Sequence, residues 1–500
     1  MQMQVAYDYD YDYELAVADY WEGRPTMEPN VWVPALPLQM TVAAPASNTD
    51  LVVSSTGQQQ LVQESTDDQH AVEVELVCKE VTRSLKHTVD KMAMKMHLFP
   101  PNMEDLASYA APKLVSIGPY HYGEGALQQM ESVKHAAAVH FIDNTGLSMQ
   151  EVYGAVCAVA DEARGHYEED KMRTPSDDDF KHMLFFDGCF LLQYMVFWCT
   201  RSKDDGGATA RVDPSLRSIF SSNDSRIFCD VVLLENQLPW VVVDTLKRLM
   251  RPPPRMEVFF GRVRITKLHT RQELSFVPDT LAAYTPPHLL GLLRYNIVGN
   301  AQVPNPGDLS DKLMEVSWSV GVTELAEIGI EVTPNDIRDD LKKMYIHRGC
   351  CTGELRLASV SLDDATATFL VNMAVFEMCT TPDFRRDDHE KSTVCSYLWL
   401  LGMVTDSVND VEALRNKHIL EGGAGLTNED VLKLFTGVEK HLRAGKRYYK
   451  TIVGIANYRY DRRWWIMFYR FGYRNRATII TVVTAIVGAV GLLATLKSFL

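Results

Sequence analysis

Cysteines are few and scattered in this 500-residue chain. Nine are present, an odd number, and no two of them form a C-x-x-C pair. A disulfide framework requires an even set of cysteines in a secreted chain, so we expect none and favour a reducing compartment.

Positively charged residues are fewer than negatively charged ones. The chain has 50 Lys and Arg against 65 Asp and Glu, a net charge of −15. Nucleic-acid binding needs clustered cations that neutralise phosphates, so we expect no nucleic-acid partner. The first residues, MQMQVAYDYDYDYE, lack the basic and apolar regions of a secretory signal peptide, so we expect the body to stay out of the secretory lumen.

The sequence also lacks a recognisable catalytic motif. No motif predicts a cofactor or a metal site, and the acidic loop at 168–179 lacks the ligand spacing of a calcium loop. One enzyme hypothesis stays open, with Cys189 or Cys199 as nucleophile and His121 or His182 as base. Cys189 lies in an apolar run, where burial makes a thiol inert, so an enzyme is the less favoured reading.

Residues 1–70 form an acidic, low-complexity N-terminal region that we expect to be disordered. Tyr and Asp alternate from Tyr7 to Tyr13, and Ser, Thr and Gln dominate from Ser54 to Gln69. Such composition buries too little apolar surface to offset chain entropy. A short interaction motif in the Tyr/Asp run is the alternative to a solvated tail.

The body, 71–457, is predicted to be mainly α, a large helical domain with a few short strands. Its first helix carries Val74, Val77, Val81 and Leu85 at helical spacing. Further helices are predicted from Ala126, over about 147–167, over 180–199 as a buried core helix, over 288–295, after Asp363 or Asp364, over 398–404 and after Thr427, where Asp430 completes a capping box. Strands are predicted around Ile330 and as a hairpin across Gly349–Gly353, an irregular loop over 298–310, and a short strand or helix end at 255–265.

Polar residues interrupt two of the apolar runs. Asp187 lies in the middle of the 180–199 helix and needs a partner. In DVVLLENQLPW, Asp230 is predicted to cap a helix start, and Pro239 ends one helix at a bend before the next. Glu235, Asn236 and Gln237 carry side chains that can bond the backbone groups freed at that bend. We interpret Asp187, Glu235, Asn236, Gln237 and Pro239 as a buried polar hinge, with an interaction site as the alternative.

The C-terminal segment is distinctive. Residues 477–496 contain no charge and are predicted to form one transmembrane helix, because about 20 apolar residues at ~1.5 Å each reach ~30 Å. Its anchor residues include Ala477, Ile479, Val482, Ile486, Gly488, Val490, Leu492 and Leu496. The preceding segment, 458–476, is basic and aromatic, with Arg462, Arg463, Trp464, Trp465, Arg470, Arg474 and Arg476.

This arrangement predicts a single-pass, tail-anchored protein. The basic flank places the body on the cytoplasmic side, and membrane lipid is the partner of the C-terminal helix. Small residues at Thr481, Ala485, Gly488 and Ala489 share one face of the helix, so self-association in the membrane is possible.

Several segments together resemble a plant family known as domain of unknown function 247. They are SIGPYHYGEGAL with Met130, Glu131 and Lys134, FKHMLFFDGCFLLQYM, DVVLLENQLPW, HLLGLLRY, TELAEIGIEV, the helix through NMAVFEMC, and the terminal basic-aromatic segment with its span. The resemblance covers 71–500. It implies a mainly helical protein with a C-terminal span and no established activity or cofactor, and some grass members act as pollen-side determinants of self-incompatibility.

From these features we expect a membrane-tethered recognition or signalling protein with an unidentified protein partner. A membrane-surface enzyme and a self-associating membrane scaffold are the alternatives.

Overall fold

The computed structural model describes residues 74, 76–84, 91–200, 212–268, 284–298, 320–335, 340–349, 352–381, 384, 391–422 and 425–499. The chain divides into Met1–Glu75 and Leu76–Leu500, and the second unit is described below. The predictions of disorder over 1–70 and of a loop over 298–310 lie outside the described residues, apart from Val298, which ends a helix.

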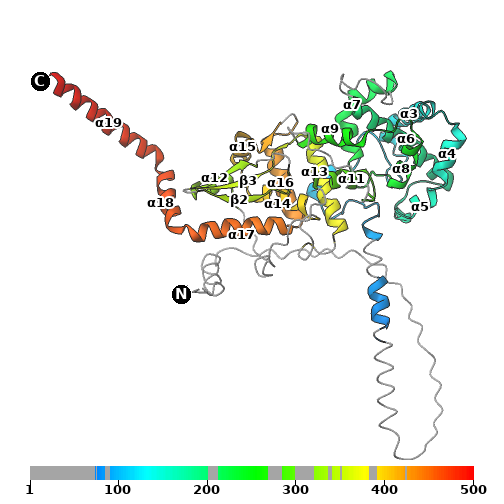
Figure 1. Cartoon of the computed structure of the whole chain (residues 1–500), viewed down its shortest axis with the longest axis horizontal. Helices are drawn as coiled ribbons and strands as arrows, with labels where there is room; N and C mark the ends of the chain where they lie inside the picture. The colour runs from blue at the N-terminus through cyan, green and yellow to red at the C-terminus, as the bar shows by residue number, and fades with distance from the viewer. Residues whose placement is uncertain are drawn as a thin grey trace, which may run out of the picture. The chain divides into compact units, whose positions relative to one another are not determined.

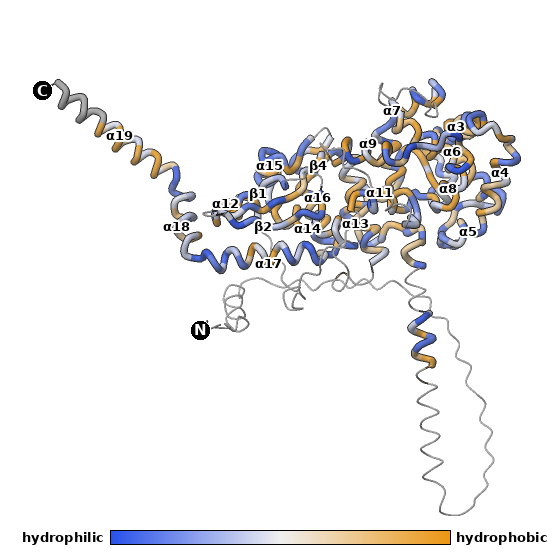
Figure 2. The backbone as a smooth tube through the Cα atoms, in the orientation of Figure 1, coloured by the Kyte–Doolittle hydropathy of each residue, from blue (hydrophilic) through white to orange (hydrophobic). Residues whose placement is uncertain are grey.

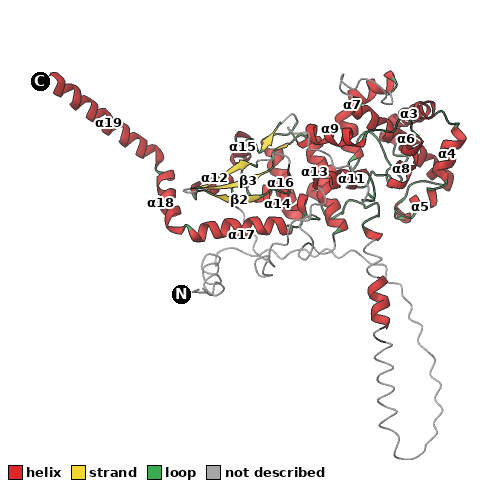
Figure 3. Ribbon diagram, viewed as in Figure 1, coloured by secondary structure: helices red, strands yellow, loops and turns green. Residues whose placement is uncertain are grey.

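The described part of the chain is mainly helical, as predicted, and its few strands are short (Figures 1 and 3). The elements up to residue 298 are η1 (Glu104–Tyr109), η2 (Gly125–Met130), α3 (Glu131–Thr145), α4 (Met149–Cys157), α5 (Ala160–Arg164), η3 (Glu169–Lys171), α6 (Asp177–Cys199), α7 (Pro214–Val231), α8 (Trp240–Leu249), α9 (Met256–Leu268) and α11 (Leu289–Val298).

The elements after residue 298 include the strands of the described residues. They are α12 (Val322–Glu327), β1 (Ile330–Pro334), β2 (Tyr345–Arg348), β3 (Gly353–Leu357), β4 (Val360–Ser361), α13 (Asp364–Thr380), α14 (Thr393–Met403), α15 (Val408–Asn416), β5 (Leu420–Glu421), α16 (Asn428–His441), α17 (Lys446–Asp461), α18 (Arg463–Arg474) and α19 (Arg476–Phe499).

Helix α6 forms the centre of the first half and confirms the predicted core helix. Ser176 caps its N-terminus by accepting the amide of Asp179, and residues 183–199 are almost all buried. Helices α3, α4, α8 and α9 pack around it (Figure 1). Gly188 lets α8 approach closely, because a Cβ there would lie 2.5 Å from Leu246 Cδ1. The glycine that interrupts the apolar run is therefore a packing requirement.

The strands form one three-stranded sheet and one short pair. The order of the first is β1-β3-β2, with β2 and β3 antiparallel, as the hairpin prediction required. Strand β1 pairs parallel with β3, Ile330 opposite Gly353, and β4 pairs parallel with β5. Helix α17 packs on β2, and Thr451 donates a hydrogen bond to the Met344 carbonyl.

One sequence prediction was wrong in detail, because the helix expected over 147–167 is broken into α4 and α5. Of the two alternatives for 255–265, the structure shows helix, since residues 256–268 form α9. Val74, Val77 and Val81 occupy helical positions as predicted, and their side chains are exposed, whereas Leu85 lies outside the described residues. Helical spacing alone does not show whether another element covers the apolar face.

Candidate functional site

The segment between α7 and α8, residues 232–239, is folded by its own polar side chains. Asn236 Nδ2 donates to the carbonyls of Val115 and Asp230, at 3.0 and 2.9 Å, and its Oδ1 accepts the Ile117 amide at 2.6 Å. Gln237 Nε2 donates to the carbonyls of Val231 and Leu233, each at 2.7 Å. Both amide side chains are buried and bond backbone groups, as predicted. The helix predicted from Asp230 to a bend at Pro239 is wrong, because α7 ends at Val231, residues 232–239 are not helical, and Pro239 is the N-cap of α8.

Asp230 has a different role from the predicted one. It lies at the end of α7 instead of capping a helix start, and its carboxylate accepts the amides of Lys113, Leu114 and Val115 at 3.0, 2.7 and 2.8 Å. The aspartate therefore fastens the 113–118 segment to the bend. Burial raises the pKa of Asp230, and the three amides oppose that rise.

Asp187 finds its partner in Lys134 of α3. The Asp187 Oδ1 to Lys134 Nζ distance is 2.7 Å, and the two side chains are 2% and 1% exposed. Lys134 Nζ also contacts Glu131 Oε1 at 2.7 Å and Ser116 Oγ at 3.2 Å. Burial raises the pKa of Asp187 to about 6 against the attraction of Lys134, whereas for Lys134 the carboxylates outweigh burial and raise its pKa.

Gly118 joins this ion pair to the bend. Its amide donates to Asp187 Oδ2 at 2.9 Å, and its φ of +81° belongs to the left-handed region. A Cβ at this position would lie 2.6 Å from the Gln237 carbonyl oxygen. The sequence SIGPYH therefore needs glycine both for its backbone and for the approach of the bend.

Glu235 and His121 occupy the edge of the same cluster. His121 Nε2 lies 2.9 Å from Glu235 Oε1, and its Nδ1 lies 3.0 Å from Glu124 Oε1. Glu235 Oε2 accepts the Phe99 amide at 3.1 Å. Burial opposes protonation of His121, but the two carboxylates outweigh it and raise its pKa. We call Asp187, Lys134, Gly118, Asp230, Glu235, Asn236, Gln237 and His121 the polar clasp.

One end of the polar clasp opens into a cleft of about 470 Å³. It is lined by Tyr122, Glu131, His135, Asp179, His182, Met183, Phe186 and Asp187. The lining is acidic and aromatic, with His135 edge-on to Phe186 at 4.3 Å between ring centroids. The sequence reading missed this cleft, because its residues come from α3, α6 and the segment before η2, and only the i,i+3 pair Glu131–Lys134 is visible locally.

The Cys/His enzyme hypothesis receives no support from these positions. Cys189 is fully buried, and burial raises the pKa of its thiol well above the usual range. Cys199 Sγ donates to the Arg255 carbonyl at 3.4 Å. Both ring nitrogens of His121 face carboxylates, and the His182 ring lies against Tyr153, 5.5 Å between centroids. Over the described residues, no group of three or more His, Cys, Asp or Glu side chains could hold a metal ion.

The basic-aromatic segment, 458–476, comprises the end of α17, all of α18 and the first residue of α19. Arg470 and Arg474 bind one carboxylate, Glu327 of α12, at 3.2 and 2.7 Å. Arg462 donates to the Gly349 carbonyl at 2.7 Å, and Arg463 and Arg476 lie over Tyr460 and Tyr473. Trp464 and Trp465 are exposed.

Helix α19 contains the predicted anchor residues. Its exposed apolar side chains include Ile479, Ile480, Val482, Val483, Ile486, Val487 and Val490, and Figure 2 colours much of the described part of the helix as hydrophobic. Among the described residues, α6 is the one helix long and apolar enough to cross a membrane, but 89% of its apolar window is buried, which identifies a core helix. The described side chains of α19 form a shorter apolar run, Arg476–Val490.

These features define a mainly helical protein whose loops are joined by a buried polar clasp, with an exposed apolar helix at its C-terminal end. The chain belongs to the domain of unknown function 247 family, described as plant proteins of unknown function, whose model matches residues 96–491. It is similar to a UPF0481 protein of Arabidopsis thaliana, 26% identical over 348 residues, 66% of this chain and 68% of that one. No solved structure matches it.

Proposed function

We propose that this chain is a membrane-attached interaction protein, with α19 crossing the bilayer and the helical body presented on one side. The observation that carries the proposal is the surface of α19, where apolar side chains from Ile479 to Val490 are exposed. Apolar surface of this extent, uncharged from Ala477 to Leu496, is expected to be covered by lipid.

The charge on either side of α19 sets the proposed orientation. Five arginines lie within the 15 residues before its uncharged stretch, Ala477–Leu496, and Lys497 follows that stretch. The arginines are Arg462, Arg463, Arg470, Arg474 and Arg476. Basic residues beside a span favour the cytoplasmic side, so the body is proposed to face the cytoplasm.

A protein partner for the body is proposed from how its polar groups are used. The polar clasp bonds mainly to backbone groups of its own chain, and Cys189 is inert through burial. This favours binding over catalysis. Proximity labelling with the full chain should recover protein neighbours that an unrelated membrane-anchored bait does not, and their absence would contradict the interaction role.

The membrane attachment is tested by placing charge in α19. Val482→Arg with Ile486→Arg should release the protein from membranes on carbonate extraction, because arginine at the centre of a span costs about 2.5–3.5 kcal/mol each. Val139→Arg with Val408→Arg is the matched control, since both valines are exposed on the body. The control and the unaltered chain should stay in the membrane pellet.

Release of the unaltered chain by carbonate, or full retention of the Val482→Arg, Ile486→Arg variant, would show that α19 does not span. Self-association through Gly488 and a role in self-incompatibility stay predictions for this chain. If the Gly488→Leu variant self-associates as the unaltered chain does, the prediction of self-association through Gly488 is wrong.

A further inference from the structure

Helix α18 has two faces with different surroundings. On one face, Ile466 packs against the core, and Arg470 and Arg474 reach Glu327 of α12. The Tyr469 ring lies 3.5 Å from the position that a Cβ on Gly329 would take. These contacts attach α18 to the turn between α12 and β1, so the helix is not a free linker between the body and α19.

The opposite face carries large apolar side chains. Trp464 and Phe471 are 67% and 68% exposed, and Met467 lies between them at 54%. Spacings of three and four residues place these three side chains in one row along the helix. Trp465 is also exposed.

The charge around this row has one sign. Asp461 is the last acidic residue of the chain, and Arg462, Arg463, Arg470, Arg474, Arg476 and Lys497 follow it. The chain as a whole carries −15, so this segment is a local exception. Helix α18 is followed directly by α19, with only Asn475 between the two helices.

We propose that the Trp464–Met467–Phe471 row of α18 lies in the headgroup layer of an anionic leaflet. The proposal rests on the proposed spanning by α19 and names the lipid that the body contacts. Tryptophan is enriched at membrane interfaces, and helix faces carrying Trp and Phe lie at the boundary of headgroups and acyl chains. Arginines beside them attract anionic headgroups. The bonds to Glu327 select which face of α18 meets the lipid, and they hold the α12–β1 turn next to the bilayer surface.

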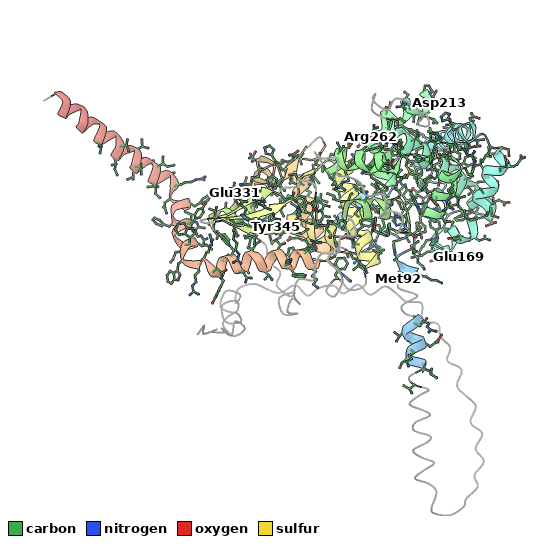
Figure 4. All side chains as sticks on the ribbon, viewed as in Figure 1. Met92, Glu169, Asp213, Arg262, Glu331 and Tyr345 are labelled. Atoms are coloured by element: carbon green, nitrogen blue, oxygen red, sulfur yellow. The ribbon has the colours of Figure 1, made fainter. Side chains whose placement is uncertain are left out.

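Photo-crosslinking on the full chain tests this face by face. The photoreactive residue p-benzoyl-phenylalanine is placed singly at Phe471 or Tyr469 of α18, at Ile480 of α19, or at Tyr345 of β2, an exposed body position labelled in Figure 4. Each protein is reconstituted in phosphatidylcholine vesicles with or without phosphatidylserine. Both lipids carry a clickable tag, and lipid adducts are counted.

Phe471 should give several-fold more lipid adduct than Tyr469 or Tyr345, and its yield should rise several-fold when phosphatidylserine is present. Equal adducts at Phe471 and Tyr345, with Ile480 labelled, would overturn the lipid-facing row and leave the span intact. If Ile480 is unlabelled, the span itself is wrong and the proposal falls with it. An equal Phe471 yield in both vesicle types would remove the anionic preference.

A second variant tests the part played by Glu327. In Glu327→Gln the charge that binds Arg470 and Arg474 is lost while the side chain keeps its size. Adducts at Tyr469 should then increase several-fold, because the helix can turn that face toward lipid. No increase would mean that Glu327 does not select the face.

Discussion

The ammonium group of Lys134 is buried between two carboxylates. At the scale of single residues, we expect substitutions at this ion pair to change the stability of the body most. Its side chain is 1% exposed, with Asp187 and Glu131 each at 2.7 Å. Taking an ammonium and a carboxylate out of water costs several kcal/mol per ion unless each is paired and hydrogen-bonded. Asp187 obtains both from Lys134 and the Gly118 amide.

Replacing Lys134 alone should therefore be costly. Lys134→Met leaves the buried Asp187 without its counter-ion and should lower the free energy of unfolding by about 3–5 kcal/mol. Urea denaturation of the full chain in detergent measures the change. The double variant Lys134→Met, Asp187→Leu should recover much of the loss, because the remaining uncompensated charge is removed.

The matched control is Lys171→Met, at an exposed pair with Asp170. Such surface pairs contribute little, so this variant should unfold as the parent does. An equal loss in both lysine variants, or no recovery in the double variant, would contradict the buried ion-pair argument.

A comparison of two glycines distinguishes the cost of backbone strain from the cost of steric contact. Gly118 and Gly123 have φ values of +81° and +75°, and only at Gly118 would a Cβ meet another atom, the Gln237 carbonyl oxygen at 2.6 Å. Both Gly→Ala changes cost about 1–2 kcal/mol from the left-handed conformation. Gly118→Ala should cost clearly more, because the bend at 232–239 must also move. Equal shifts in thermal midpoint would show that the close approach is relieved without cost.

At the scale of helices and strands, local signals were read correctly and long-range ones were missed. Thr427 and Asp430 form the predicted capping box of α16, and Asp363 caps α13 as expected. These motifs lie within four residues, so the sequence displays them completely. By contrast, Glu377 of α13 bonds the Val394 and Cys395 amides at the start of α14, at 3.1 and 2.9 Å. Its 17-residue separation from Val394 gives no local pattern.

Glu377 is the clearest test of such a cap between elements. Its Oε1 also accepts two hydrogen bonds from Arg294 of α11, and its side chain is 1% exposed. Glu377→Ala removes the buried carboxylate that the Arg294 guanidinium and two amides bond, and should cost about 3 kcal/mol in urea denaturation. Thr427→Ala, a local cap on α16, should cost about 1 kcal/mol. If the two losses are equal, Glu377 acts as a cap alone, without the ion pair.

The candidate site shows the same difference between local signals, which the sequence displays, and long-range contacts, which it does not. Asn236 and Gln237 were predicted to satisfy the bend, since their bonds to the Asp230, Val231 and Leu233 carbonyls are local. The role of Asp230 was mistaken, because its partners lie more than 110 residues earlier in the chain. An aspartate before an apolar run has the sequence signature of an N-cap, and only tertiary structure shows otherwise.

For the whole molecule, mainly helical composition could be predicted because apolar spacing is a property of each segment. Pairings between distant segments could not. The parallel pairing of β1 with β3 joins Ile330 to Gly353, and that of β4 with β5 joins Val360 to Leu420. A strand of two to five residues carries too little pattern to specify its partner.

Acid should destabilise the whole body through its buried histidines. His288, beside Phe376 at 5.0 Å between ring centroids, is fully buried, and burial lowers its pKa to about 3, with His97 and His166 adding repulsion. Between pH 6.5, its value when unfolded, and about 3, only the unfolded chain takes up this proton. Its contribution to stability is therefore complete above pH 6.5 and falls by up to about 1.4 kcal/mol per pH unit below it.

Asp187 acts in the opposite direction, because its folded pKa of about 6 lies above the unfolded value of 3.8. The folded state takes up that proton first. Glu439, whose pKa burial raises to about 7, acts in the same direction as Asp187, and burial lowers the pKa of His97 to about 4, so the parent chain shows the sum of several groups. The difference between variants isolates His288. His288→Asn keeps an acceptor for the Gly291 amide, which His288 Nδ1 accepts at 3.2 Å, but cannot be protonated. His347→Asn, on the exposed strand β2, is the control.

Urea denaturation at pH 7.0, 6.0 and 5.0 should show a shallower loss of stability for His288→Asn than for the parent, and an unchanged slope for His347→Asn. Parallel slopes in all three proteins would mean that the buried imidazole is solvated before the body unfolds.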